Sequence, residues 1–398
     1  MTTKAGVGLS RQHNPNLAGR EAAEQALKKA GVEKPAFVFM FASIGYDQHS
    51  VLRAVREATG GAPLTGCSVE GTIDGDDADE SNFSVLVTVI SSDDLRWHNG
   101  LATDLSADSC ALGKRVAKDL LPHLSADTIG LFIFPDGLTY DIDNFFAGLE
   151  EDLPSERFLP IWGGGAGNNL NLGKPTYQYC DDEVVSDGIS YALLSGEARP
   201  AWAIGHSLIP IGGERIVTRS EGNVIYEIDG KPATEVLKEY LPEDALTEDR
   251  DWLRYAISLA LSFRAPSYMK DEEYIVRGVP QLSLTDGSIT VQTEVEEGTS
   301  LWFSSRDKEK ITTGFDRMAA KIKEQLDGAQ PELVFQFECV TRGKLMFREQ
   351  EKLQLLKRFR QSVGPDVPWV GFYTIGEIAP VEEHNGINRF VSIILALS

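Results

Sequence analysis

The sequence has no apolar run that approaches the roughly 18–20 residues needed to span a bilayer. Its first residues, Met1–Pro15, contain no apolar segment of the kind found in secretory signal peptides. Basic residues are also few: 38 Lys and Arg stand against 60 Asp and Glu, which gives a net charge of −22. Duplex nucleic acid and anionic membranes both need a basic surface, so this composition argues against either as a partner. We therefore expect a cytoplasmic protein that binds neither.

Motifs for metal and redox chemistry are missing as well. The four cysteines lie far apart and form no CxxC pair, so neither a zinc knuckle nor a redox pair is expected. No HxxxH or HExxH pair occurs among the six histidines. The acidic stretch Asp74–Glu80 lacks the ligand order of a calcium-binding EF-hand loop and is typical of a solvated loop. The sequence therefore predicts no metal site.

Glycine-rich bends are present three times. They read LTGCSVEGTID at Leu64–Asp74, LPIWGGGAGNN at Leu159–Asn169 and PWVGFYTIGEIAP at Pro368–Pro380. In each, a short apolar run precedes glycines that are separated by small or polar residues. The second bend lacks the Lys–Ser/Thr pair of a P-loop, and no helix-forming stretch follows it as a dinucleotide-binding loop requires. Neither nucleotide-binding fingerprint is therefore present.

Each bend closes a unit of strand, helix and strand. The units begin with the strand-like runs AFVFMF at 36–41, IGLFIFPDG at 129–137 and ELVFQFEC at 332–339. Helix-forming stretches follow at 51–61, 142–153 and 348–362. This pattern predicts an α/β fold of two lobes, built from repeated strand–helix–strand units with mixed sheets. Because the repeats give way to a different composition near 196–210, we expect an N-terminal lobe at 1–199 and a C-terminal lobe at 200–398.

The bends have two interpretations. Glycine lets another group approach the backbone closely, and successive N–H groups at a bend can form an anion-binding concavity. In open α/β sheets, ligands bind beyond the carboxyl ends of the strands. Alternatively, each glycine only relieves crowding where a strand leaves the sheet. We expect a ligand cavity where the bends from both lobes converge.

Several residues at these strand ends are candidates for contact with a ligand. They are Cys67, Ser68, Gly71, Gly165, Asn168, Arg342, Gly376 and Glu377. The guanidinium of Arg342 is suited to clamp a carboxylate, with a surface ion pair as the alternative. Glu377 can accept from a ligand ammonium or pair with Arg342. Together they would suit the two charges of an amino acid. The side-chain amide of Asn168 offers a ligand both a hydrogen-bond donor and an acceptor. Alternatively, Asn168 is there only because asparagine favours turns.

Cys67 is the residue that would make the protein an enzyme. A cysteine nucleophile needs a nearby base and an electropositive setting, and the sequence pairs no histidine with Cys67. A buried structural thiol is the more ordinary role for such a residue. We therefore predict no catalytic residue and rank an enzyme last among the function classes.

Five segments, taken in order, resemble the FIST family, in which a FIST N domain precedes a FIST C domain. They are GCSVEG, WGGGAGNN, RSEGNVIYEIDGKPATEVLKEYL, FECVTRGKLMF and GFYTIGEIAP. The resemblance covers nearly the whole chain. It implies an intracellular sensory or signal-transduction protein, found in bacteria, that binds a small ligand such as an amino acid. Such regions often occur with a kinase, a cyclase or a chemoreceptor. Because no output domain is expected outside the two halves, we expect a separate partner protein.

Two alternatives to this sensor remain open. Some bacterial proteins of the FIST family are haem-dependent nitric oxide sensors, and haem needs only one axial histidine in an apolar pocket. CxxCH is absent, so any haem would be non-covalent, and His13 and His49, in loops after strands, are the candidate ligands. The cofactor is otherwise unknown. The second alternative is an interaction scaffold without a ligand, which would show an absent or collapsed cavity.

Overall fold

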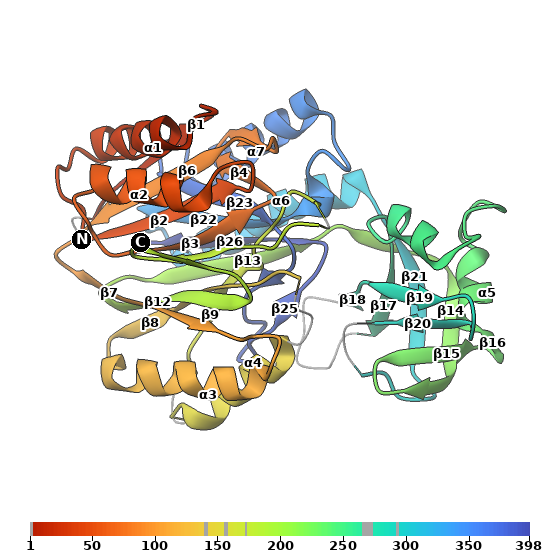
Figure 1. The fold of residues 1–398 in the computed structure, drawn as a ribbon. Helices are drawn as coiled ribbons and strands as arrows, with labels where there is room; N and C mark the ends of the chain where they lie inside the picture. Colours follow the sequence, from red (N-terminus) through yellow and green to blue (C-terminus); the bar gives the residue numbers. More distant parts are fainter. Residues whose placement is uncertain (1–2, 139–141, 155–157, 172, 265–273, 292–293) are drawn as a thin grey trace. The chain divides into compact units, whose positions relative to one another are not determined.

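A computed structural model describes residues 3–138, 142–154, 158–171, 173–264, 274–291 and 294–398 (Figure 1). The chain forms two compact units. The core unit comprises Met1–Gly205 with Thr312–Ser398, and the inserted unit comprises His206–Ile311. Among the described helices, none combines the length and the apolar character that a membrane crossing requires.

The core unit repeats one order of elements three times. The first repeat consists of β1 (Lys4–Ser10), α1 (Pro15–Ala30), β2 (Phe37–Ser43), α2 (Gln48–Ala58), β3 (Leu64–Val69), β4 (Gly71–Asp74), β5 (Asp77–Asp79) and β6 (Val85–Ser91). The second consists of β7 (Leu95–Thr103), α3 (Ser109–Leu120), β8 (Thr128–Pro135), α4 (Ile142–Asp152), β9 (Ile161–Gly164), β10 (Gln178–Cys180), β11 (Glu183–Val185) and β12 (Gly188–Gly196).

The third repeat has the same order, with the inserted unit between its first strand and its first helix. It consists of β13 (Pro200–His206), α6 (Lys308–Leu326), β22 (Leu333–Cys339), α7 (Glu349–Val363), β23 (Trp369–Thr374), β24 (Glu377–Ile378), β25 (Ile387–Asn388) and β26 (Val391–Leu397). The chain leaves the core unit at the end of β13 and returns to it within α6.

Each repeat completes the sheet of another repeat. The three six-stranded sheets have the orders β1-β6-β2-β3-β10-β11, β7-β12-β8-β9-β24-β25 and β13-β26-β22-β23-β4-β5. The last two strands of each sheet come from a different repeat. The second repeat contributes β10 and β11 to the sheet of the first, the third contributes β24 and β25 to the sheet of the second, and the first contributes β4 and β5 to the sheet of the third. In every sheet the second and third strands of the repeat, such as β2 and β3, pair in parallel, while the other pairings that we cite are antiparallel. The exchange is therefore cyclic, and no repeat has a complete sheet of its own.

Local sequence signals explain where the first helix begins and ends. The side chain of Asn14 accepts hydrogen bonds from the N–H groups of Asn16 and Leu17, and Pro15 occupies the first turn, where its missing N–H costs nothing. Gly31 ends the helix in the left-handed conformation at φ 66°, which a residue with a side chain rarely adopts. The strand that follows, β2, is buried along its whole length because helices cover one face and the core covers the other.

Phenylalanines from the central strands of all three repeats meet in the core. The ring centroid of Phe39 in β2 lies 5.4 Å from that of Phe132 in β8 and 5.2 Å from that of Phe335 in β22. The centroids of Phe132 and Phe335 are 4.8 Å apart. Each strand carries a second phenylalanine two residues on, on the same face. The Phe-x-Phe pattern of the sequence is thus the signature of one shared core.

The inserted unit has its own sheet and its own hydrophobic cluster. Its elements are β14 (Leu208–Glu221), β15 (Val224–Ile228), β16 (Lys231–Pro232), α5 (Ala233–Lys238), β17 (Leu259–Arg264), β18 (Tyr274–Arg277), β19 (Gln281–Ser283), β20 (Ser288–Thr290) and β21 (Ser300–Arg306). The long strand β14 pairs with β21 and with β15, and register shifts interrupt both pairings. The strand order is β18-β17-β21-β14-β15-β20-β19, and β16 joins at β15.

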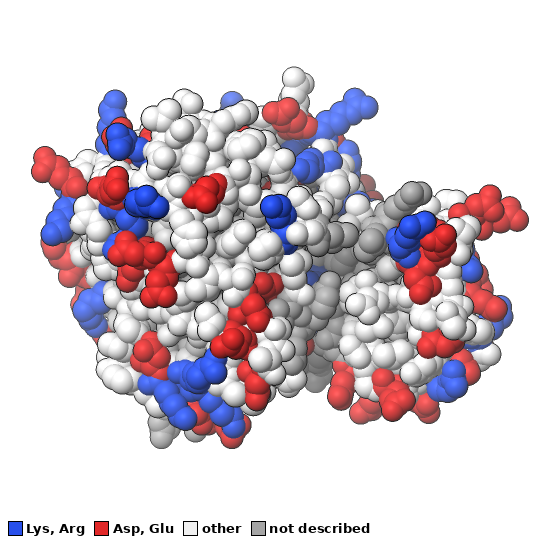
Figure 2. Space-filling view, viewed as in Figure 1, with Lys and Arg blue, Asp and Glu red and all other residues white. Residues whose placement is uncertain are grey.

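The α/β class, the repeated strand–helix–strand units and the mixed sheets predicted from the sequence are confirmed. The compact units divide the chain differently from the predicted lobes, because residues 312–398 pack with the first 205 residues. The predicted boundary between an N-terminal lobe at 1–199 and a C-terminal lobe at 200–398 lies just before β13, and it stays a prediction. On the face shown in Figure 2, acidic and basic side chains are interspersed.

Candidate functional site

The three glycine-rich bends lie side by side in the core unit. The N–H of Gly167 donates to the carbonyl of Ser68 at 2.8 Å, which joins the first bend to the second. The N–H of Gly165 donates to the carbonyl of Gly376 at 2.8 Å, which joins the second bend to the third. The N–H of Glu70 donates to the carbonyl of Tyr373 at 3.0 Å and closes the ring. Segments about a hundred or more residues apart in sequence thus meet backbone to backbone.

This convergence leaves little space beside the glycines themselves. A Cβ at Gly165 would lie 2.3 Å from the carbonyl oxygen of Ile375, and one at Gly71 would lie 2.6 Å from that of Asp79. Gly376 has φ 94°, a conformation that favours glycine. All three glycines therefore serve close packing in this structure, and contact with a ligand at these positions stays a prediction.

Ser68 and Asn168 tie the bends together. The Ser68 hydroxyl donates to the Gly167 carbonyl at 2.6 Å and accepts from the N–H of Tyr177 at 2.9 Å. The Asn168 side chain donates to two carbonyls in its own loop, at 2.8 and 2.9 Å, and its N–H donates to Glu70 Oε1 at 2.7 Å. Burial raises the pKa of Glu70 to about 7 against the opposing effect of the Asn168 N–H. Glu70 was not among the predicted residues.

Cys67 and Glu377 are fully buried. Cys67 belongs to the central hydrophobic cluster, and burial raises the pKa of its thiol, which disfavours the nucleophilic thiolate. The Glu377 carboxylate accepts from the hydroxyl of Thr374 and from the N–H of Val391. Burial raises the pKa of Glu377 to about 8, although these hydrogen bonds oppose the change. Glu377 is therefore largely protonated at neutral pH.

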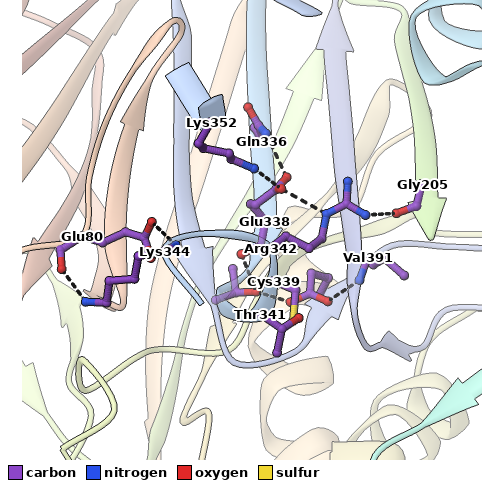
Figure 3. Close-up of polar contacts among 12 residues, drawn as sticks. Glu80, Gly205, Gln336, Glu338, Cys339, Thr341, Arg342, Lys344, Lys352 and Val391 are labelled. Carbon is purple, nitrogen blue, oxygen red and sulfur yellow. Dashed lines mark hydrogen bonds and ion pairs between the residues drawn. The ribbon is translucent and has the colours of Figure 1, made fainter. Parts of the chain in front are cut away.

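Arg342 is also fully buried, and its carboxylate partner is Glu338. Arg342 Nε lies 3.0 Å from Glu338 Oε1, and Nη1 donates to the carbonyl of Gly205 at 2.9 Å. The guanidinium lies 5.3 Å from the ring centroid of Phe315 on α6. The alternative in which Arg342 pairs with Glu377 is wrong, because Arg342 binds Glu338 (Figure 3) and Glu377 accepts from Thr374 and Val391.

Glu338 joins two cations inside the third repeat. Lys352 Nζ on α7 lies 2.6 Å from the same Oε1 atom that Arg342 contacts, and Gln336 donates to Oε2 at 3.0 Å (Figure 3). Burial alone would raise the pKa of Glu338, but Lys352 and Arg342 outweigh it and hold the pKa at about 2. Burial lowers the pKa of Lys352, and Glu338 opposes that change. We call Glu338, Arg342 and Lys352 the buried trio.

The corresponding positions in the other two repeats are apolar. Met40, Ile133 and Gln336 each pair with the glycine that opens the bend of their own repeat. Two residues further on, the three strands carry Ala42, Pro135 and Glu338. Of the three strands, β22 alone carries a polar residue at each of the two positions, Gln336 at the first and Glu338 at the second. A common packing requirement of the fold does not explain this difference, so we regard it as a sign of function.

A cavity of about 670 Å³ lies beside the buried trio. Its described lining residues are Arg11, Asp77, Ala78, Asp79, Glu80, Ser81, Lys344, Phe347, Glu349, Lys352, Leu353 and Tyr373. One wall is the hairpin that the first repeat contributes, and the other is formed by β23, α7 and the loop before α7. The cavity therefore lies where two repeats meet in the core unit.

Tyr373 lines this cavity and has a buried hydroxyl. Its side chain is fully buried, and within the described part of the chain its Oη has no hydrogen-bond partner. Burial, assisted by Glu80 and Glu338, raises the pKa of Tyr373, so the group keeps its proton. A buried polar group without a partner is costly, and such groups in native structures call for an explanation. The Tyr373 hydroxyl therefore retains the capacity to donate one hydrogen bond.

Two further contacts hold the walls of the cavity. The backbone N–H of Lys344 lies 2.7 and 3.0 Å from the carboxylate oxygens of Glu80, and Lys344 Nζ donates to the Glu80 carbonyl at 2.7 Å. Burial raises the pKa of Glu80 to about 7 against the effect of Lys344. Arg11 pairs with Asp77 at 2.8 Å and with Asp79 at 2.5 Å. The Lys344 contacts hold the hairpin of the first repeat against the third, and the Arg11 ion pairs hold the hairpin within the first repeat.

The described cavity lining includes none of the eight predicted residues. Arg342 is linked to it through Glu338 and Lys352, whereas the other seven belong to the packed bends or the strands that lead into them. A signal for the missed residues was present in the sequence. FQFEC in β22 alternates phenylalanine with Gln336 and Glu338, which places two polar groups on one face of a buried strand.

The histidines considered for haem are both exposed. His13 stacks on Phe83 with ring centroids 4.5 Å apart, and His49 lies in the first turn of α2. Neither therefore lies in an apolar pocket of the kind that an axial haem ligand requires. Within the described ranges, no three His, Cys, Asp or Glu side chains are grouped so as to hold a metal ion.

We predict that Glu338→Gln strongly destabilises the core unit, because it leaves Arg342 and Lys352 buried without a carboxylate. Removing one partner of a buried ion pair costs about 3–5 kcal/mol. Urea denaturation of the full chain measures this loss. Asp316→Asn, which removes an exposed pair with Arg358, is the matched control with an expected loss below about 1 kcal/mol. Equal losses in the two variants would contradict the assigned role of Glu338.

We also predict that stability falls between about pH 5 and pH 8 because of Glu377. Its pKa is raised to about 8 in the folded protein, so the folded state binds a proton that the unfolded state has already released. One such group lowers stability by at most about 1.4 kcal/mol per pH unit in this window, and the slope ends above the folded pKa. Glu377→Gln should flatten the pH profile of the urea midpoint relative to wild type; an unchanged slope would refute the assignment.

The chain aligns with several known proteins, in sequence or in fold. Uncharacterised proteins of Mycobacterium tuberculosis are similar to it, one at 26% identity and one at 24%, and the alignments cover 97–98% of both partners. Among solved structures, a cyanuric acid hydrolase from A. caulinodans aligns with a TM-score of 0.40 at 9% identity, and a chorismatase with 0.36 at 11%. Both alignments cover 99–100% of each chain. Scores this low support no inference about activity.

Family models match most of the sequence. The FIST N domain model matches residues 36–231, and the FIST C domain model matches residues 233–380. The two matches are contiguous and in the order that the quoted motifs indicated. The chain therefore belongs to the FIST family, whose domains are sensory signal-transduction domains.

Proposed function

We propose that this protein is an intracellular sensor that binds a small polar ligand in the cavity of the third repeat. The observation that carries this proposal is the placement of the buried trio. Polar and charged residues replace apolar ones in the third repeat, whose Lys352 and Tyr373 line this cavity. Buried charge is costly to a fold, so its retention beside a cavity favours a binding role over a structural one.

The size and walls of the cavity support a small-molecule ligand. A volume of about 670 Å³ is within the range of roughly 300–1,000 Å³ that is usual for small-ligand pockets. The lining carries both signs of charge, with Lys344 and Lys352 on one side and Asp77, Asp79 and Glu80 on the other. We propose a ligand of amino-acid size with groups of both charges. Such a ligand would bridge the hairpin of the first repeat and α7 of the third.

A chain of buried contacts leads from the cavity to the limit of the core unit. Lys352 lines the cavity and contacts Glu338, which contacts Arg342, which donates to the carbonyl of Gly205. Gly205 is the last residue of the core unit before the chain enters the inserted unit. We propose that a ligand, by changing the contacts of Lys352, shifts the populations of two states of this connection.

The output of the sensor would be read by another protein. We propose that a separate signalling partner, such as a kinase, a cyclase or a chemoreceptor, distinguishes the two states in the cytoplasm. The net charge of −22 favours a partner other than nucleic acid or an anionic membrane. Of the eight predicted site residues, Arg342 would connect Glu338 to Gly205 in this proposal. The other seven would stabilise the bends on which the cavity walls depend.

Calorimetric titration of the full chain with each of the twenty amino acids tests this proposal. We expect one or a few of them to bind, because their two charges match the lining. Lys352→Met should weaken that binding at least tenfold, whereas Lys29→Met, which removes an exposed lysine paired with Asp74, should leave it unchanged. Arg342→Ala should weaken it as well. If none of the twenty produces heat, the amino-acid ligand is wrong.

A further inference from the structure

The buried trio carries an unbalanced positive charge. It contains two cations, Arg342 and Lys352, and one carboxylate, Glu338, and all three side chains are nearly or fully buried. Gln336, the other polar side chain bound to Glu338, is neutral. Both cations contact the same oxygen, Glu338 Oε1, and among the described residues Arg342 Nη2 has no hydrogen-bond partner. A buried charge without a counterion is strongly unfavourable, so the trio calls for one more negative group.

In the described part of the chain, Glu338 is the one carboxylate recorded in an ion pair with Arg342 or Lys352. Glu80 is the other carboxyl whose charge acts on Lys352, but burial raises its pKa to about 7, and its carboxylate hydrogen bonds are recorded with the backbone of Lys344 and not with the trio. Asp77 and Asp79 are paired with Arg11. Glu349 lies in the exposed first turn of α7 and makes no direct contact with the trio that the structure records. A negative group on a molecule in the cavity would complete the charge balance of the trio.

The two donors that would receive it belong to residues that line the same cavity. Lys352 Nζ uses one contact on Glu338 and is otherwise surrounded by aromatic rings, 5.5 Å from the ring centroids of Phe315 and Phe347 and 5.6 Å from that of Tyr373. Tyr373 contributes the buried hydroxyl that has no partner in the described part of the chain. An ammonium has three donor hydrogens and a phenol has one, so both groups can donate to one acceptor.

We propose that the cavity is a carboxylate site, in which Lys352 Nζ and the hydroxyl of Tyr373 donate to the carboxylate of a small organic acid. This inference rests on the proposed function and adds the charge of the ligand and its two anchoring residues. A carboxylate carries one negative charge, which equals the excess charge of the trio. A phosphate carries about −1.5 to −2 at neutral pH and would overcompensate it. Charge-assisted hydrogen bonds of this type are also the stronger ones in proteins.

Acetate and acetamide provide a direct test, because they have nearly the same shape and differ in charge. Each is titrated into the full chain at low, fixed ionic strength in a zwitterionic buffer, with ethylammonium as the cationic probe and inorganic phosphate as the competing anion. We expect acetate to bind with a dissociation constant of about millimolar, as suits so small a fragment. Acetamide and ethylammonium should bind at least tenfold more weakly, and phosphate more weakly than acetate.

Two variants locate the site. Tyr373→Phe removes a hydroxyl that makes no recorded hydrogen bond, so the fold should be unaffected while acetate affinity falls about tenfold. Lys352→Met leaves the neutral pair of Glu338 and Arg342 and should abolish acetate binding. Tyr226→Phe, on β15 of the inserted unit, is the matched control and should bind acetate as the wild type does. Denaturation curves of all variants confirm that they are folded.

The outcomes separate this inference from the proposed function. If acetamide or ethylammonium binds as well as acetate, or if Tyr373→Phe leaves acetate affinity unchanged, the carboxylate site is wrong although the cavity can still bind ligands. Tighter binding of phosphate would assign the site to another class of anion and overturn the inference. Acetate binding with no response to any amino acid would support the carboxylate site and contradict the amino-acid ligand. No binding by any probe refutes both.

Discussion

The cyclic exchange of strands among the three repeats is the constraint on which the rest of this structure depends. Every sheet of the core unit is finished by a hairpin from another repeat, so the three repeats must fold around one core. Phe39, Phe132 and Phe335 fill its centre with mutual ring contacts. The bends that follow the parallel strands then meet at one place, because strands in equivalent positions end at the same level of the core. Glycine is needed there since backbones approach too closely for a side chain.

The proposed function depends on a departure of one repeat from the common pattern. At the two corresponding strand positions the first two repeats carry Met40 with Ala42 and Ile133 with Pro135, whereas the third buries Gln336 and Glu338, the latter bound to Arg342 and Lys352. The exchanged hairpin of the first repeat then forms the opposite wall of the cavity. A ligand in that position would contact two repeats at once. The response that we propose would pass from the buried trio to Gly205, the last residue of the core unit before the inserted unit.

Much of the fold was predictable because its signals are local and repeated. The Phe-x-Phe strands, the helix-forming stretches and the three glycine bends each recur in order, and the meeting of the bends follows from the ends of the strands. The site was harder to predict. The partner of Arg342 is four residues earlier in the chain, at Glu338, and was hidden within what reads as an apolar strand. The cavity depends on the pairing of β4 with β23, about three hundred residues apart in sequence, which no local pattern encodes.

The most direct test of the central claim is a high-resolution crystal structure of the protein grown with a small carboxylate such as acetate. The account predicts density for one carboxylate group within hydrogen-bond distance of both Lys352 Nζ and Tyr373 Oη, with Glu338 still bound to Lys352 and Arg342. A cavity closed by the side chains of Phe347 and Leu353, or a Tyr373 hydroxyl bound to a protein group instead, would contradict it.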